Sequence, residues 1–159
     1  MRRSIPALLI AVIAAFTVAA CGGSEDSAPP TKAEYTKQYQ PINRAIGRLA
    51  VDVGKAVETA SGKSNKALTK TFGDLADQMN AEADKLDDLT PAENPVVIKQ
   101  QPAMVKAMRT IADDLDAVAS GAEKNALKVA AEGAAKLARD APALGESRAA
   151  MNKALGVKS

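Results

Sequence analysis

The chain has 159 residues and a formal net charge of +2, and Arg2 and Arg3 account for that excess of positive charge. This length suffices for one domain with a modest core, and the neutral remainder excludes the basic surface that nucleic-acid binding requires. Histidine is absent and there is one cysteine, which excludes imidazole chemistry and any internal disulfide. Abundant alanine, leucine and charged residues, with few aromatic ones, favour helices over strands.

The first twenty residues have the pattern of a secretory signal peptide. Two arginines follow Met1, and an apolar stretch then runs from Ile5 to Val18. That stretch is shorter than the ~20 residues that a membrane-spanning helix needs, and it ends in small residues. We therefore expect residues 1–20 to be removed from the exported protein.

The end of this segment, Val18-Ala19-Ala20-Cys21, resembles the bacterial lipobox, with valine at the position where leucine is usual. The resemblance implies that diacylglycerol is attached to the Cys21 thiol and that a dedicated signal peptidase, recognising Val18, Ala19 and Ala20, cuts before Cys21. It also implies acylation of the freed amine, for example with palmitate. Such a protein is exported and lipid-anchored to the outer face of the cell membrane. The alternative is a small buried cysteine at the end of an ordinary signal or anchor helix.

A polar segment, Gly-Gly-Ser-Glu-Asp-Ser-Ala-Pro-Pro-Thr, follows Cys21. It contains nothing that can bury apolar surface, so we expect residues 21–32 to form a flexible tether. As a random coil this tether would span roughly 18 Å.

Residues 33–159 are predicted to form one helical domain. Apolar residues recur at intervals of three and four in four segments, which predicts helices over about 32–60, 64–89, 95–119 and 122–140, the last continuing to about 156. Breakers separate the segments at Ser61-Gly62, at 90–95 and at Ser120-Gly121. Similar lengths and short connections predict an all-α fold, an antiparallel up-down four-helix bundle.

Two prolines complicate this pattern. Pro102 would either kink the third helix or mark its true start, because its ring clashes with the carbonyl group of Ile98. Pro142 follows Asp140, so 141–156 is either a bent extension of the fourth helix or a short fifth helix. Within this last segment Arg148 interrupts the apolar phase.

Two acidic runs are the only candidates for a cation site or for acid-base chemistry, and they comprise Asp84, Asp87 and Asp88, and Asp113, Asp114 and Asp116. An antiparallel pair of helices turning near residue 93 would place Asp87 beside Lys99 and Asp116 beside Lys70. The runs would then lie at opposite ends of the pair, each with a cationic neighbour. We therefore interpret them as solvated helix faces and predict no metal site and no catalytic residue.

The two tyrosines lie one helical turn apart near the tether, at Tyr35 and Tyr39. They could form an aromatic lip for a ligand or for the membrane interface, or they could close the core at the end of the bundle. Four methionines, Met79, Met104, Met108 and Met151, have heptad-like positions that fit the core.

The whole chain resembles the small, alanine-rich helical lipoproteins of Gram-positive, high-GC bacteria, which often carry a Leu-x-x-Leu-x-Pro step, here Leu86, Leu89 and Pro91. The resemblance implies no shared biochemical role. Because enzyme motifs and cofactor ligands are lacking, we expect a membrane-anchored lipoprotein of the cell envelope with a binding or scaffolding role toward an envelope protein partner. One alternative is a carrier of a small hydrophobic ligand in the bundle core, for which the alanine-rich fourth helix would leave space. The other is an envelope enzyme.

Overall fold

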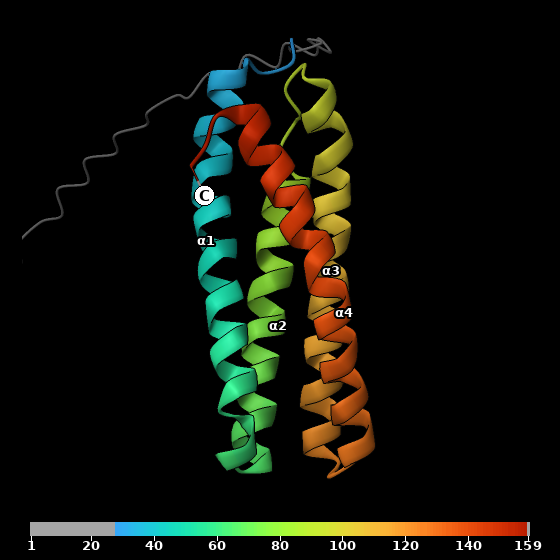
Figure 1. Ribbon diagram of the computed structural model, residues 1–159. Helices are drawn as coiled ribbons and strands as arrows, with labels where there is room; N and C mark the ends of the chain where they lie inside the picture. The colour runs from blue at the N-terminus through green and yellow to red at the C-terminus, as the bar shows by residue number, and fades with distance from the viewer. Residues whose placement is uncertain (1–27, 159) are drawn as a thin grey trace, which may run out of the picture.

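The computed structural model describes residues 28–158 (Figure 1). Its elements are four helices and one short 3-10 turn, namely α1 (Lys32–Glu58), η1 (Ala60–Gly62), α2 (Asn65–Asp87), α3 (Pro95–Glu123) and α4 (Leu127–Leu155). Successive helices run in opposite directions, so the predicted all-α, up-down four-helix bundle is confirmed.

Side-chain caps explain where three of the helices begin. Thr31 and Glu34 form a capping box at α1, in which the Thr31 side chain accepts from the Glu34 amide and the Glu34 carboxylate accepts from the Thr31 amide. Ser64 caps α2. Asn94 caps α3 ahead of Pro95, as the cap-then-proline pattern predicts.

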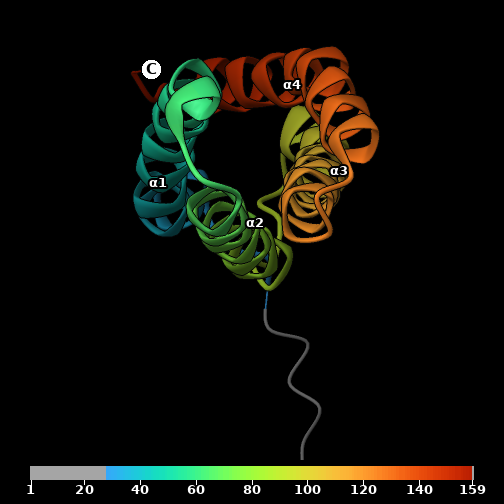
Figure 2. The ribbon, with the colours of Figure 1, turned by 90° about the horizontal axis from the view of Figure 1, so that it is seen from below.

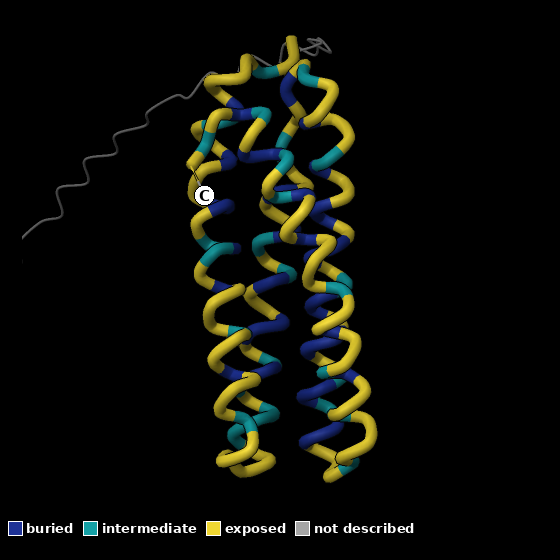
Figure 3. Tube along the Cα trace, viewed as in Figure 1, coloured by how far each residue is buried: buried dark blue, intermediate teal, exposed yellow. Residues whose placement is uncertain are grey.

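The buried residues of all four helices lie toward the inside of the bundle (Figure 3), and most of them are apolar. α3 packs along α2 on one side and along α4 on the other, whereas α1 packs mainly on α2 and meets α4 over a short stretch. Seen from the end opposite the tether, α4 turns away from α3 and crosses toward α1 (Figure 2). The four predicted core methionines, Met79, Met104, Met108 and Met151, are all fully buried, which confirms that assignment.

The third connection lies later than the sequence indicates. Ser120 and Gly121 belong to α3, and the turn comes at residues 124–126, where Asn125 takes a positive φ of 52°. Gly121 is needed for close packing: a Cβ atom there would lie 2.4 Å from the backbone nitrogen of Ala130 in α4. Gly133 has a similar role, since its Cβ would lie 2.9 Å from the Val118 nitrogen.

Both prolines lie inside continuous helices. α3 starts at Pro95 and passes through Pro102, so the alternative start near Pro102 is wrong. α4 likewise continues through Pro142 to Leu155, which makes 141–156 an extension of α4 and not a fifth helix. Proline removes one helical hydrogen bond and crowds the preceding turn, so a helix bends readily at that residue. Pro142 therefore gives α4 a point at which it can change direction toward α1.

Candidate functional site

The residues predicted to carry the lipid anchor lie outside the described part of the chain. These are Cys21, the peptidase-recognition residues Val18, Ala19 and Ala20, and the rest of the signal segment. The described chain begins at Ala28 and enters α1 at Lys32, at the predicted end of the tether. Among the described residues no helix is both long and apolar enough to span a membrane.

The first acidic run is exposed and forms ion pairs with an arginine. Arg109 lies 3.1 Å from Asp84 and 2.9 Å from Asp87, so the partner of Asp87 is Arg109 and not Lys99. The reason is that helical side chains lean toward the N-terminus of their own helix, which lets the long Arg109 side chain reach back along α3. Lys70, expected beside Asp116, pairs instead with Asp74, four residues along the same helix.

The second acidic run contains one buried carboxylate. Asp114 faces α4, while Asp113 and Asp116 are exposed. Burial raises the pKa of Asp114, and the nearby charge of Asp140 adds to that effect. Within residues 28–158 no group of three or more acidic or cysteine side chains is placed to hold a metal ion.

Both tyrosines are core residues, with 1% of Tyr35 and none of Tyr39 exposed. Their rings stack with centroids 6.1 Å apart. The Tyr35 hydroxyl donates to Oε1 of Gln101 at 2.8 Å, and Nε2 of Gln101 donates to the Leu86 and Leu89 carbonyl groups at the end of α2. Of the two alternatives for these tyrosines, the structure therefore has the one in which they pack in the core, and buried rings present no aromatic lip to a ligand.

The Tyr39 hydroxyl connects the first helix to the last. It donates to Oδ1 of Asn152 at 3.0 Å. Burial raises the pKa of Tyr39 to about 12, an effect that the positive charge of Arg148 partly offsets. The hydroxyl therefore remains a protonated donor at neutral pH.

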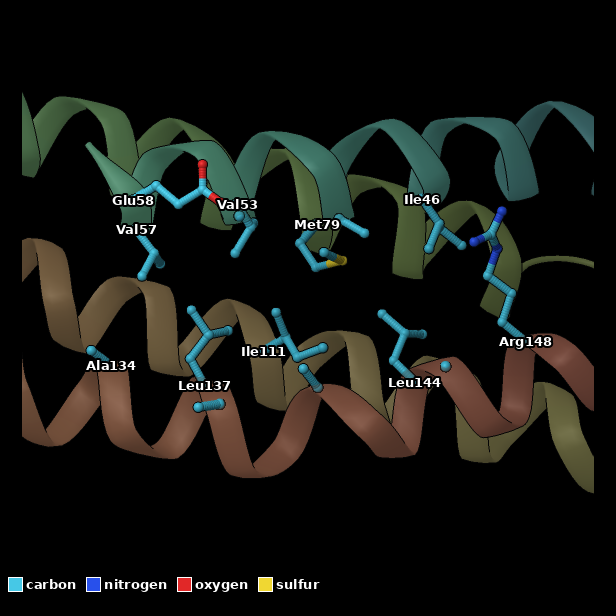
Figure 4. Close-up of a pocket in the computed structure, with 15 residues that line it drawn as sticks. Ile46, Val53, Val57, Glu58, Met79, Ile111, Ala134, Leu137, Leu144 and Arg148 are labelled. Atoms are coloured by element: carbon cyan, nitrogen blue, oxygen red, sulfur yellow. The ribbon is translucent and has the colours of Figure 1, made fainter. Parts of the chain in front are cut away.

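An apolar cleft with a volume of about 490 Å³ lies between α1 and α4. That volume lies within the range of small-molecule sites, ~300–1,000 Å³. Figure 4 shows side chains of α1 facing those of α4 across it, with Met79 of α2 and Ile111 of α3 also lining it. We call this the α1–α4 cleft; its principal lining residues are Ile46, Val53, Val57, Leu137, Ala138, Ala141 and Leu144.

Small residues and the course of α4 together create the cleft. Ala138 and Ala141 stand on α4 where a closed bundle would place larger side chains, and Gly54 faces them from α1. Alanine cannot fill the space left where α4 leans away from α1 (Figure 2). Ala138, Ala141 and Gly54 are all exposed, so the cleft is open to solvent along its length.

Arg148 lies at the end of the α1–α4 cleft nearest the tether, and Glu58 lies at the opposite end (Figure 4). The Arg148 Nε donates to Oδ1 of Asn43 at 2.6 Å, and Nη2 donates to the Asn43 carbonyl oxygen at 3.3 Å. Gly47 makes room for this group, since a Cβ there would lie 2.9 Å from Nη2. Two sequence signals pointed to this site: the alanine-rich fourth helix and the interruption of its apolar phase at Arg148.

Comparisons of the chain with family models, with curated proteins and with solved structures found no match.

Proposed function

We propose that the chain is a lipoprotein of the cell envelope, exported and lipid-anchored through Cys21 to the outer face of the cell membrane. The order of segments supports this: a positive start, an apolar stretch, the Val18-Ala19-Ala20-Cys21 pattern and a polar tether. A bundle whose first helix is capped at Thr31 would follow that tether directly. Two or more acyl chains make such attachment stable, because each buried methylene contributes about 0.8 kcal/mol.

The anchor is tested by growing cells that express the full chain with an alkyne analogue of palmitate. We expect label on the wild type and on Ser24→Ala, a matched change in the tether, and none on Cys21→Ser. The Cys21→Ser protein should also keep its first twenty residues, which the mass of the intact chain reports. Label that survives Cys21→Ser would contradict the assignment.

We further propose that the anchored bundle binds a small apolar molecule in the α1–α4 cleft, a binding role and not a catalytic one. The cleft itself supports this proposal, since its walls are almost entirely aliphatic and open to solvent. Exposed apolar walls are costly in water, and an apolar ligand that covers them regains about 25 cal/mol per Å² of buried apolar surface. A small bundle without a ligand would gain stability from larger residues at 138 and 141.

The binding role is tested with full-length protein anchored in phosphatidylcholine vesicles and hexadecanol that carries a photoreactive diazirine in mid-chain. We expect the label to map to residues 134–145 and 46–58. Ala138→Phe should remove most of the label, because its ring would occupy the cleft. Ala135→Phe is the matched control, since Ala135 is exposed on α4 and does not line the cleft. Equal labelling of the two variants would refute the proposal.

A scaffolding role toward an envelope protein is a second candidate. It is favoured by three exposed apolar side chains at the end of the bundle away from the tether, Val57, Leu127 and Val129. A photoreactive amino acid at position 129 would report it. We expect a discrete crosslinked band in intact cells, and we expect Leu127→Ser to weaken it. Absence of any crosslinked band would exclude a scaffolding role for this end of the bundle.

A further inference from the structure

We propose that the ligand of the α1–α4 cleft is a single-chain amphiphile with an anionic headgroup, bound with its head on Arg148 and its chain directed toward Glu58. This inference rests on the binding role proposed above and adds to it the chemical class and the direction of the ligand. The occupant follows from three properties of the cleft: a cation at one end, an aliphatic trough of limited length, and an anion at the other end.

The cation is positioned and has donors to offer. Arg148 forms no ion pair among residues 28–158, although six pairs occur elsewhere in that part of the chain. Asn43, which holds its Nε and Nη2, is neutral, so the positive charge is oriented without being neutralised. Nη1 has no hydrogen-bond partner within the described chain, and a guanidinium edge matches the two oxygens of a carboxylate or phosphate.

Arg148 also occupies a position in α4 where packing alone would favour an apolar side chain. It is half-buried, directly beside the apolar residues Ile46 and Leu144 that line the same end of the cleft. A methionine or leucine would continue the apolar phase of α4 at this position. An arginine held against Gly47, at the end of an aliphatic trough, instead provides a place for a ligand's charged group.

The length of the trough sets the length of the chain. From Ile46 to Glu58 the rise along α1 is about 18 Å. An extended alkyl chain advances about 1.3 Å per carbon, because C–C bonds of about 1.5 Å meet near the tetrahedral angle. The trough therefore takes roughly 14 carbons, and a volume of about 490 Å³ suits one chain of that length.

The charges at the two ends of the cleft set the direction in which the ligand binds. Glu58 is exposed at the far end of the cleft, so an anionic head placed there would be repelled, whereas at Arg148 it would be attracted. Between these two residues the labelled side chains in Figure 4 are all apolar. The headgroup thus lies at the end of the cleft that is nearer the start of α1.

The test uses full-length protein anchored in phosphatidylcholine vesicles and three photoreactive probes of equal chain length: tetradecanoic acid, tetradecyl phosphate and tetradecanol. We expect one or both anionic probes to label the cleft at about tenfold lower concentration than the alcohol, the effect of one charge-assisted hydrogen bond. Arg148→Gln should abolish that preference and leave tetradecanol labelling unchanged, while Arg148→Lys should retain part of it. Arg44→Gln, at an exposed arginine of α1, should change nothing.

The outcomes separate this inference from the binding role. Labelling of the cleft by all three probes at equal concentration, unaffected by Arg148→Gln, would overturn the anionic headgroup and leave the binding role intact. No labelling of the cleft by any probe would refute both. A crosslink between two copies of the chain through residues 134–145 would show that a second copy fills the cleft, and would also refute both. Circular dichroism of each variant verifies that the helices are retained.

Discussion

The hydroxyl of Tyr39 donates to Oδ1 of Asn152 across 3.0 Å, so the first and last helices are joined by a hydrogen bond inside the core. Asn152 is 3% exposed, and its Nδ2 has no hydrogen-bond partner in the described chain. We expect Tyr39→Phe to lower the free energy of unfolding by about 1–2 kcal/mol, because it leaves the whole Asn152 amide buried without a partner. Urea denaturation measures the change.

The double variant Tyr39→Phe with Asn152→Leu is the matched control for that bond. Replacing both polar partners by apolar groups removes the unsatisfied amide, so we expect much of the lost stability to return. If the two single effects simply add, the two side chains are not coupled as described.

Gln101 is expected to be the most costly polar residue to remove. Its amide caps two carbonyl groups at the end of α2 and accepts from Tyr35. Gln101→Leu leaves these three groups without their partner, and we expect a loss of about 2–4 kcal/mol. Gln100→Leu, at the neighbouring partly exposed position, should cost little. Thermal unfolding measures both variants, and an equal loss of stability in Gln101→Leu and Gln100→Leu would contradict the capping role.

Gly121 should tolerate no side chain. In Gly121→Ala the new Cβ would meet the Ala130 backbone at 2.4 Å, so α3 and α4 must separate, and we expect a loss of about 1–3 kcal/mol. Gly73→Ala is the control: nothing lies within 4 Å of a Cβ there, and alanine should stabilise α2 by about 0.5–1 kcal/mol. Opposite signs in urea denaturation would support the close contact, and two gains would contradict it.

Asp114 should make stability depend on pH. Its pKa is raised from 3.8 by burial and by Asp140, and Oδ2 lacks a partner within the described residues. The folded state therefore holds the proton more tightly than the unfolded state, so the free energy of unfolding falls as pH rises from 3.8 through the raised pKa. We expect Asp114→Asn to be more stable than wild type at neutral pH, with a gain that shrinks as pH falls toward 3.8.

The measurement for Asp114 is a series of urea unfolding curves across that pH range. Asp113→Asn, at the exposed neighbouring position, provides the comparison and should leave stability nearly unchanged. A gain for Asp114→Asn that is the same at every pH would mean that packing, and not protonation, is responsible.

The helices could be predicted from sequence because one physical constraint repeats along each of them. Residues that face the core recur every three or four positions, and in α3 this stripe, from Val97 to Val118, is buried throughout. The start of α3 at Pro95 could be predicted from its cap, since the free amide groups at the start of a helix need an acceptor close by in the sequence. Helix periodicity and capping both depend on residues that are close in sequence, so a short segment is enough to predict them.

The end of α3 and the α1–α4 cleft could not be predicted in that way. The sequence does not distinguish a glycine that ends a helix from one that lets another helix approach closely. At Gly121 the close approach of Ala130 in α4 shows that the second applies. The cleft depends on the direction that α4 takes past α3, which no periodicity encodes. The alanines of α4 suggested that space would be left, but not that Arg148 would stand at one end of it.

The hydrogen bonds that join α1 to α4 within residues 28–158 all involve the first half of α1. They are the bonds from Tyr39 to Asn152 and from Arg148 to Asn43. Between Arg148 and Glu58 the side chains that these two helices turn toward the cleft are aliphatic. Movement of the first half of α4 away from α1 therefore breaks no polar contact between them, so the far end can widen to admit a ligand while the end nearer the start of α1 stays fixed.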